Sequence, residues 1–358
     1  MSSGKVLVPG FMMSPDTQRA FANAGFELDF ALSEEERSHG RWAFERAKMR
    51  SEITQKALAE RIHEARVLCA NDVTGHLPVP ADLIRRADKL EVIYIGAAGF
   101  DKIDAAAATE RGIVIFNAPG GNAIGVSEHA LTLMLTLARR VDATSRYSRE
   151  TGKWARQYAM TSTPSIGELY GKTLGIVGFG FIGRHLADRA RLGFHMRIVA
   201  YDPFFDRLEA ERLGVELVHD LNEVLAQSDF ISLHTPLNAA TQGLIGREQF
   251  KLMKPSAYLI NTARGPIVDT DALIEALEAK QIAGAGLDCT EPEPLPDNHK
   301  LFTMENVVVT PHVGGACGED IKRSETVAAR LAIDFLQGRG ARHAANPKAV
   351  EKHKARFG

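Results

Sequence analysis

Cysteine is scarce in this chain of 358 residues, which contains only Cys69, Cys289 and Cys317. An odd number of cysteines without the spacing of metal ligands argues against a disulfide framework and against a cysteine-based metal centre. The three thiols fit a reducing compartment, and we expect small buried side chains that fill packing gaps. No metal site is predicted.

An excess of charge of either sign is also missing. The sequence has 43 Lys and Arg against 45 Asp and Glu, a formal net charge of −2. This balance gives no electrostatic argument for nucleic acid or a membrane surface as a partner. The longest apolar run, near residues 130–138, is far shorter than the ~20 residues that span a bilayer. The first residues lead into a strand without a secretory apolar core, so we expect a cytoplasmic protein.

The sequence does contain a regular alternation of strand-like and helix-like segments. A chain of this length is expected to form two domains. In its first part the alternation predicts a parallel sheet with helices on both faces. Strands are predicted at 6–8, 67–69, 91–95 and 113–116, and helices at 16–24, 53–65, 81–87 and 104–111.

A second series of strands follows Trp154, and it predicts a doubly wound nucleotide-binding sheet. Between the two series, an alanine- and leucine-rich helix at 126–140 is apolar almost all round, so it is buried within the chain or against a partner subunit. The basic segment after Gly338 is expected to be a solvated tail. The predicted strands of the second series are 174–177, 198–201, 230–233, 258–261, 284–287 and 307–309.

A last helix at 319–335 comes after the second sheet is complete, and we expect it to return to the first unit. The predicted domains are therefore a discontinuous one, 1–118 with 319–358, and one inserted into it, 119–318. The fold class is α/β with two Rossmann-like domains.

Three glycines at G-x-G-x-x-G spacing lie between the first strand of the second series and a helix. Gly178 suits the tight turn, Gly180 lets a pyrophosphate approach the backbone, and Gly183 lets the helix pack against the strand. The helix start, with Phe181 and Ile182, offers unpaired N–H groups to phosphates. This context predicts a dinucleotide site.

Asp202 closes that strand–helix–strand unit, about 20 residues after the glycines. Its carboxylate can accept hydrogen bonds from both ribose hydroxyls but would repel a 2′-phosphate, which favours NAD over NADP. A solvated turn acid before Pro203 is the alternative. Arg197 and Arg207 lie close to Asp202 in sequence and could weaken the preference for NAD over NADP.

Polar residues follow four strands of the second series. The carboxyl ends of parallel strands lie at one edge of the sheet, where ligands bind, so we expect these residues to converge on one cleft. His234 with Thr235 and Pro236 is expected on the adenosine side. The segments after the other three strands contribute further candidate site residues, and not all of these are polar: Thr262, Ala263, Arg264, Asp288, Glu293, His312 and Gly314.

An arginine, two acids and a histidine suit hydride exchange on a 2-keto acid. The histidine can protonate the carbonyl oxygen, a carboxylate can orient the imidazole, and the guanidinium can pair with the substrate carboxylate. Asp288 can accept from the nicotinamide carboxamide. Alone, His312 could cap a loop, Arg264 could form a structural ion pair, Glu293 could be a solvated loop acid, Asp288 a turn former, and His234 plain packing. Their joint occurrence favours the functional interpretation.

Together these motifs resemble the D-isomer-specific 2-hydroxyacid dehydrogenase family. The resemblance implies that Arg264, Glu293 and His312 form a catalytic trio, with Arg264 and His312 also touching substrate. It implies that Asp288 holds the nicotinamide amide and Asp202 the adenosine ribose, and that backbone N–H groups of Ala98 and Gly99 bind the substrate carboxylate. The motifs are at 95–104, 117–122, 126–129, 178–183, 253–254, 261–265, 288–294 and 310–315.

The same resemblance implies an NAD-binding domain inserted in a flavodoxin-like substrate-binding domain. It further implies a homodimer joined through the NAD-binding domains, with the helix at 126–140 at its centre.

Departures from the family pattern reduce the number of substrates that we expect. Formate dehydrogenases have glutamine in place of Glu293, and phosphite dehydrogenases have lysine in place of Ala98. The loop at 71–76 lacks the basic residues usual in phosphoglycerate dehydrogenases, and no long regulatory extension follows Gly338. Glyoxylate, hydroxypyruvate and pyruvate remain, with the segment at 11–13 a candidate for shaping the pocket.

We therefore expect an NAD(H)-dependent D-2-hydroxyacid dehydrogenase that works as a 2-keto acid reductase. The alternatives are an NAD-sensing corepressor-like binding protein of the same fold and a phosphoglycerate dehydrogenase. An L-specific dehydrogenase is disfavoured, because its glycine motif usually lies near the N-terminus, unlike Gly178.

Overall fold

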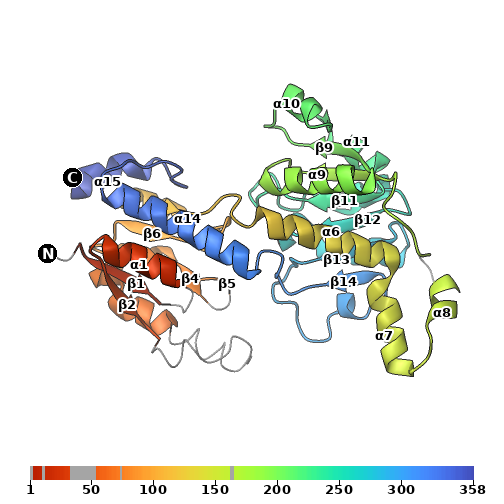
Figure 1. Cartoon of the computed structure of the whole chain (residues 1–358), viewed down its shortest axis with the longest axis horizontal. Helices are drawn as coiled ribbons and strands as arrows, with labels where there is room; N and C mark the ends of the chain where they lie inside the picture. The colour runs from red at the N-terminus through yellow and green to blue at the C-terminus, as the bar shows by residue number, and fades with distance from the viewer. Residues whose placement is uncertain (1–2, 10–12, 33–53, 73–74, 162–164) are drawn as a thin grey trace. The chain divides into compact units, whose positions relative to one another are not determined.

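The computed structural model describes residues 3–9, 13–32, 54–72, 75–161 and 165–358, and these form two compact units (Figure 1). Unit 1 is Met1–Asn122 with Gly318–Gly358, and unit 2 is Ala123–Cys317. Both units are built on parallel sheets, as the alternation of strands and helices predicts.

Unit 1 contains a five-stranded sheet in the order β2-β1-β3-β6-β7, with every pairing parallel. This is the flavodoxin-like order. The edge strand β2 was not predicted: it is only partly buried and pairs with β1 alone. The strands are β1 (Lys5–Val8), β2 (Glu27–Phe30), β3 (Ala65–Cys69), β6 (Val92–Tyr94) and β7 (Val114–Phe116).

Helices from both ends of the chain cover this sheet. One core contains Val6 and Val8 of β1 together with Ala328 and Ala332 of α14, which lies beside α1 in Figure 1. Within the described residues, the helix predicted at 53–65 covers 54–61 and is followed by η1 (Ile62–Glu64), so it ends earlier than predicted. Residue 53 lies outside the described residues. The other elements are α1 (Pro15–Asn23), β4 (Asn71–Asp72), β5 (Gly75–His76), α4 (Ala81–Arg86), α5 (Ala105–Glu110), α14 (Gly318–Leu336) and α15 (Ala349–Phe357).

The prediction of a solvated tail after Gly338 is wrong. Asn346, only 7% exposed, joins this segment to the sheet: its Oδ1 accepts from Ile115 N at 2.8 Å, and its Nδ2 donates to Ile113 O at 2.9 Å. Further on, Arg356 Nη1 donates to Arg111 O at 2.7 Å. The segment therefore docks on unit 1 through Asn346 and through polar side chains of its last helix, such as Arg356 and His353, whose Nε2 lies 3.1 Å from Glu91 Oε2.

We expect Asn346→Ala to lower the free energy of unfolding of unit 1 by about 2–4 kcal/mol. The substitution removes hydrogen bonds and leaves buried N–H and C=O groups of the β7 region without partners. Urea unfolding followed by circular dichroism measures the effect. Arg342→Ala, at an exposed position of the same segment, is the control and is expected to unfold like wild type. Equal midpoints for the two variants would contradict this account.

Unit 2 contains a seven-stranded parallel sheet in the order β10-β9-β8-β11-β12-β13-β14. Its order reverses between β8 and β11, which is the topological switch point where doubly wound sheets bind ligands. All six predicted strands are present, and β10, again an edge strand, is the addition. The strands are β8 (Thr173–Val177), β9 (Arg197–Tyr201), β10 (Glu216–Val218), β11 (Phe230–Leu233), β12 (Tyr258–Asn261), β13 (Gly284–Leu287) and β14 (Val307–Val309).

Helices cover both faces of this sheet, and each face has its own apolar core. The helix α6 buries Leu133 and Met134 against the sheet but leaves Glu128 and Thr132 exposed, so its surface is less uniformly apolar than predicted. The elements are α6 (Ala123–Arg139), α7 (Val141–Thr151), α8 (Arg156–Thr161), α9 (Phe181–Phe194), α10 (Arg207–Arg212), α11 (Leu221–Gln227), α12 (Arg247–Leu252), η2 (Gly265–Ile267), α13 (Thr270–Glu278) and η3 (Lys300–Phe302).

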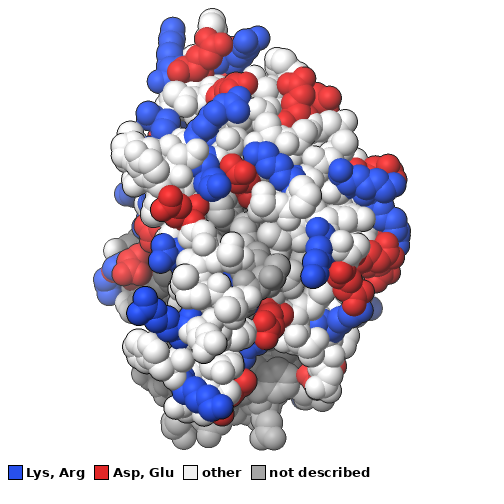
Figure 2. Space-filling model, turned by 90° about the vertical axis from the view of Figure 1, so that its right-hand side faces the viewer, with Lys and Arg blue, Asp and Glu red and all other residues white. Residues whose placement is uncertain are grey.

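The surface agrees with the balanced composition. On the face in Figure 2, acidic and basic side chains are interspersed. In the part of the chain that the structure describes, we find no helix with the length and apolar character needed to cross a bilayer.

Candidate active site

The glycine motif forms the turn between β8 and α9. Gly178 has φ +96°, and a Cβ there would lie 2.8 Å from the carbonyl carbon of His234. A Cβ on Gly183 would lie 2.4 Å from Gly178 O, whereas Gly180 faces open space. Gly180 also precedes α9 without a side-chain cap, so the first N–H groups of the helix remain available. This cradle fits a pyrophosphate.

Asp202 follows β9 and supports the same turn. Its Oδ2 accepts from Phe179 N at 2.8 Å and its Oδ1 accepts from Phe204 N at 2.9 Å. The two arginines that could bind a 2′-phosphate are paired with acids: Arg197 with Glu216 at 2.5 Å, and Arg207 with Glu211 at 3.1 Å. The local charges therefore favour a ribose with free hydroxyls.

Buried polar atoms without partners lie beside the glycine turn. Within the described residues, His234 Nδ1, Thr235 Oγ1 and Thr262 Oγ1 have no hydrogen-bond partner. Burial lowers the pKa of His234 to about 3, so the ring is neutral, and its Nε2 lies 2.9 Å from Ser232 Oγ. Buried polar atoms normally find partners, and unsatisfied ones at strand ends suit a polar ligand such as a dinucleotide.

Two glycine variants separate cofactor binding from folding. We expect Gly180→Ala to weaken NADH binding, because its methyl group enters the space for the pyrophosphate, and to cost at most about 1 kcal/mol of stability as a poorer cap. We expect Gly183→Ala to cost about 1–3 kcal/mol through its clash with Gly178 O. Fluorescence titration with NADH and thermal unfolding measure both effects. Normal NADH affinity in Gly180→Ala would exclude the cradle as the phosphate site.

Arg264 lies in the loop after β12, and the backbone of this loop is fixed by Asn261. The Asn261 side chain accepts from Ala263 N at 3.1 Å and donates to Arg264 O at 2.9 Å. Gly265 follows, where a Cβ would lie 1.9 Å from Thr290 O. Only glycine allows this approach between the loop of Arg264 and the loop after β13.

Asp288, at the end of β13 and 3% exposed, organises the loop after β14. Its carboxylate accepts from Val313 N at 2.9 Å, Gly314 N at 2.8 Å and Thr310 Oγ1 at 2.7 Å, and His129 Nε2 lies 3.3 Å away. Burial opposes ionisation, but the bonds from His129, Thr310 and the two amides outweigh it and lower the pKa of Asp288 to about 2. The loop is thus held by a permanent negative charge.

His312 lies in this loop with φ +53°, and its backbone N–H donates to the backbone carbonyl oxygen of Asp288 at 2.9 Å. A left-handed conformation at a non-glycine residue persists where surrounding contacts enforce it, often at functional sites. The His312 Nδ1 lies 2.8 Å from Glu293 Oε1. The adjacent side chains of Cys289 and Glu293 raise the pKa of His312 to about 10, against the burial of the ring.

The structure gathers the predicted cofactor residues and the trio at the carboxyl edge of the sheet of unit 2, on the turns after β8, β9, β11, β12, β13 and β14. Ala98 and Gly99 belong to unit 1, where Ala98 O accepts from Asn117 Nδ2 at 2.6 Å. Of the proposed pocket segment, residues 11 and 12 lie outside the described residues. So do residues 73 and 74 of the loop at 71–76.

Sequence reasoning assigned no role to three residues that support the site: His129, Thr310 and Asn261. Each lies inside a quoted motif, but its role depends on contacts with distant loops. The prediction of buried thiols holds for Cys69 and Cys289 and is wrong for Cys317, which is exposed.

Comparison with known proteins agrees with this geometry. Residues 131–314 match the family described as D-isomer specific 2-hydroxyacid dehydrogenase, NAD binding domain. D-3-phosphoglycerate dehydrogenase from Methanocaldococcus jannaschii is 42% identical over 303 residues, 84% of this chain, but the chain spans only 56% of that protein's length. Glyoxylate reductase from Thermococcus litoralis is 44% identical over 262 residues, 73% of this chain and 78% of the reductase.

Among solved structures, the holo form of D-mandelate dehydrogenase from Rhodotorula graminis is similar over 96% of this chain and 98% of its own, with a TM-score of 0.82 and 30% identity. The glycine turn, the supported carboxylate of Asp202 and the matched domain agree on NAD as the cofactor. The chain therefore belongs to the D-isomer specific 2-hydroxyacid dehydrogenase family.

Proposed function

We propose that this protein is an NAD(H)-dependent D-2-hydroxyacid dehydrogenase that reduces a small 2-keto acid. The observation that carries the proposal is the hydrogen bond between His312 and Glu293, on loops fixed at the edge of a dinucleotide-binding sheet. NADH, when bound, supplies the hydride. His312 supplies the proton to the carbonyl oxygen, and Glu293 fixes the orientation and tautomer of its ring.

Arg264 is the proposed partner of the substrate carboxylate, because a guanidinium offers a forked, permanently charged donor. Asn261 fixes the backbone from which it projects. Backbone N–H groups of Ala98 and Gly99 are proposed to bind the same carboxylate, which would make unit 1 the substrate-binding domain. The close approach of Gly265 to Thr290 keeps the loop of Arg264 packed against the loop of Glu293.

The proposed substrates are unphosphorylated acids of the size of glyoxylate, hydroxypyruvate or pyruvate. Phosphoglycerate is the second candidate, because a relative 42% identical is a D-3-phosphoglycerate dehydrogenase. Steady-state NADH oxidation with each keto acid, including 3-phosphohydroxypyruvate, separates the two. We expect higher kcat/KM for an unphosphorylated acid, and a lower value with NADPH than with NADH. No turnover with any of them, alongside tight NADH binding, would refute the enzyme and favour a corepressor-like binding protein.

The pH dependence of reduction follows from the raised pKa of His312. Reduction needs the protonated His312 ring, so kcat/KM for the keto acid is maximal below this pKa and decreases as the pH rises above it. Glu293→Gln removes a negative charge that raises the pKa, and we expect the falling limb to move to lower pH by about one unit or more. The pH profile of kcat/KM at saturating NADH tests this. If kcat/KM falls at the same pH in Glu293→Gln and in wild type, Glu293 does not act on the pKa of His312.

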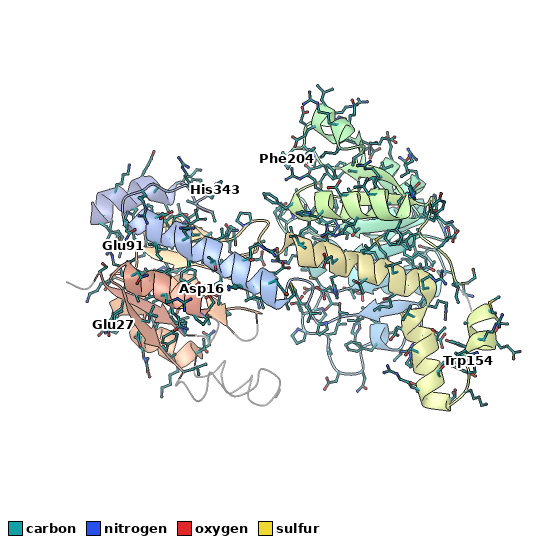
Figure 3. All side chains as sticks on the ribbon, in the orientation of Figure 1. Asp16, Glu27, Glu91, Trp154, Phe204 and His343 are labelled. Atoms are coloured by element: carbon teal, nitrogen blue, oxygen red, sulfur yellow. The ribbon has the colours of Figure 1, made fainter. Side chains whose placement is uncertain are left out.

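We further propose a homodimer through unit 2. The groove between α6 and α9 is lined by Leu131, Leu135 and Leu192, and Leu192 is 64% exposed. Trp154, 89% exposed, lies between α7 and α8 (Figure 3). An apolar groove rimmed by charged side chains, here Glu128 and Arg189, is typical of a subunit contact. Analytical ultracentrifugation decides the oligomeric state, and a monomer at micromolar concentration would refute the dimer.

A further inference from the structure

Beside His312 and Glu293, the site contains a thiol, that of Cys289, to which the proposed acid–base chemistry gives no role. The Cys289 sulfur, a carboxylate oxygen of Glu293 and a ring nitrogen of His312 all lie within 4.8 Å of one another. Cys289 is 1% exposed, and its thiol donates to Ala263 O at 3.3 Å. A thiol, an imidazole and a carboxylate together are a ligand set that borderline-soft divalent ions prefer.

The spacing of these three atoms suits a tetrahedral ion. With bonds of about 2.0–2.3 Å, zinc ligands lie roughly 3.3–3.6 Å apart. The three atoms therefore need to shift by about an ångström or less. The contact of 2.8 Å between His312 and Glu293 would widen as the ion replaces the proton that they share.

Access and chemistry favour zinc over magnesium or calcium. The side chains of Glu293 and His312 are 42% and 36% exposed, so an ion can reach them from solvent. The Cys289 side chain is buried, so its sulfur would bind the ion from the protein side. Magnesium and calcium prefer oxygen ligands, whereas sulfur and nitrogen select zinc. Three protein ligands leave a fourth position for water.

We propose that Cys289, Glu293 and His312 form an inhibitory binding site for Zn²⁺. On binding, the ion loses water ligands, the Cys289 thiol and the His312 imidazolium each release a proton to solvent, and the lone pair freed on His312 binds the metal. Glu293 then binds the ion instead of accepting from the imidazole, so His312 no longer holds the proton for the substrate. The inhibition rests on the proposed function, whereas the metal binding does not.

Metal binding to the full-length protein is measured without substrate. We expect wild type to bind about one Zn²⁺ per chain in a titration against a chromogenic chelator. Co²⁺ should give the near-ultraviolet absorption of a thiolate ligand. Cys289→Ser should lose the absorption and bind zinc at least tenfold more weakly. Cys317→Ser, which removes an exposed cysteine outside the trio, is the matched control and should behave as wild type. His312→Ala, measured for metal binding alone, is a second variant that should also lose zinc.

Inhibition is then measured against each variant's own rate without metal. Micromolar Zn²⁺ should inhibit wild type and Cys317→Ser, with reversal by EDTA, and should inhibit Cys289→Ser at least tenfold less. Equal zinc binding by wild type and Cys289→Ser, or no zinc binding by wild type, would overturn the proposal. A chain that binds zinc through Cys289 but reduces no 2-keto acid would keep the metal site and refute the proposed function. An active enzyme without zinc binding would do the opposite.

Discussion

Replacing His312 by alanine is expected to lower kcat for 2-keto acid reduction by about 10²–10⁴-fold, the usual contribution of a positioned acid–base group. The variant loses the proton donor held by Glu293 at 2.8 Å. NADH affinity is expected to stay close to wild type, because the glycine turn and Asp202 lie on other loops. Steady-state kinetics and a separate fluorescence titration with NADH measure the two quantities.

The matched control for this experiment is His219→Ala, which removes an exposed histidine from the same unit. We expect its kcat and its NADH affinity to equal those of wild type. A His312→Ala enzyme with kcat within tenfold of this control would remove His312 from its proposed role. A loss of NADH binding equal to the loss of kcat would instead indicate a collapsed loop, since the same loop is tied to Asp288.

Arg264→Ala is expected to lower kcat/KM for the keto acid by about 10²–10³-fold, the range found when one preorganised donor to a developing charge is removed. Arg264→Lys should recover little of this loss, because an ammonium group cannot form the forked pair with a carboxylate. The measurement is a keto acid titration at saturating NADH, with KM and kcat resolved separately. A rise in KM larger than the fall in kcat would place Arg264 mainly in substrate binding.

Arg247→Ala is the control for charge and size. Arg247 lies in the same unit and pairs with Glu275 at the surface, at 2.6 Å. An exposed ion pair contributes little to stability, and we expect unchanged kinetics. If Arg264→Lys retained full activity, a point charge would suffice and the forked contact would be refuted.

The parallel sheets were predictable because their central strands are buried on both faces and read as short apolar runs. The two missed strands of the large sheets, Glu27–Phe30 and Glu216–Val218, are edge strands that pair on one side only. Much of their order comes from that pairing, so their own sequences carry little signal. The docked C-terminal segment was missed for a related reason: single polar side chains such as Asn346 and Arg356 fix it, and single residues have no periodicity.

The candidate site was predictable to the extent that its residues follow strands. The turns after β8, β12, β13 and β14 lie at one edge because parallel strands align their carboxyl ends. The support for these residues was not predictable. His129 approaches Asp288 from a helix distant in the sequence, and Cys289 meets His312 only because two loops fold against each other. Spacing along the chain contains no trace of either contact.

The covering of the first sheet by α14 has a consequence for biosynthesis. All five strands of that sheet leave the ribosome before unit 2, but one of their apolar faces, with Val6, Val8 and Val92, packs against Ala328 and Ala332 of α14. Because α1 contributes only Phe21 to this core from the N-terminal side, the nascent chain carries part of this face uncovered while the whole of unit 2 is translated. Unit 2 is continuous and can fold first, whereas we expect the N-terminal part to complete its core only when the last helices emerge.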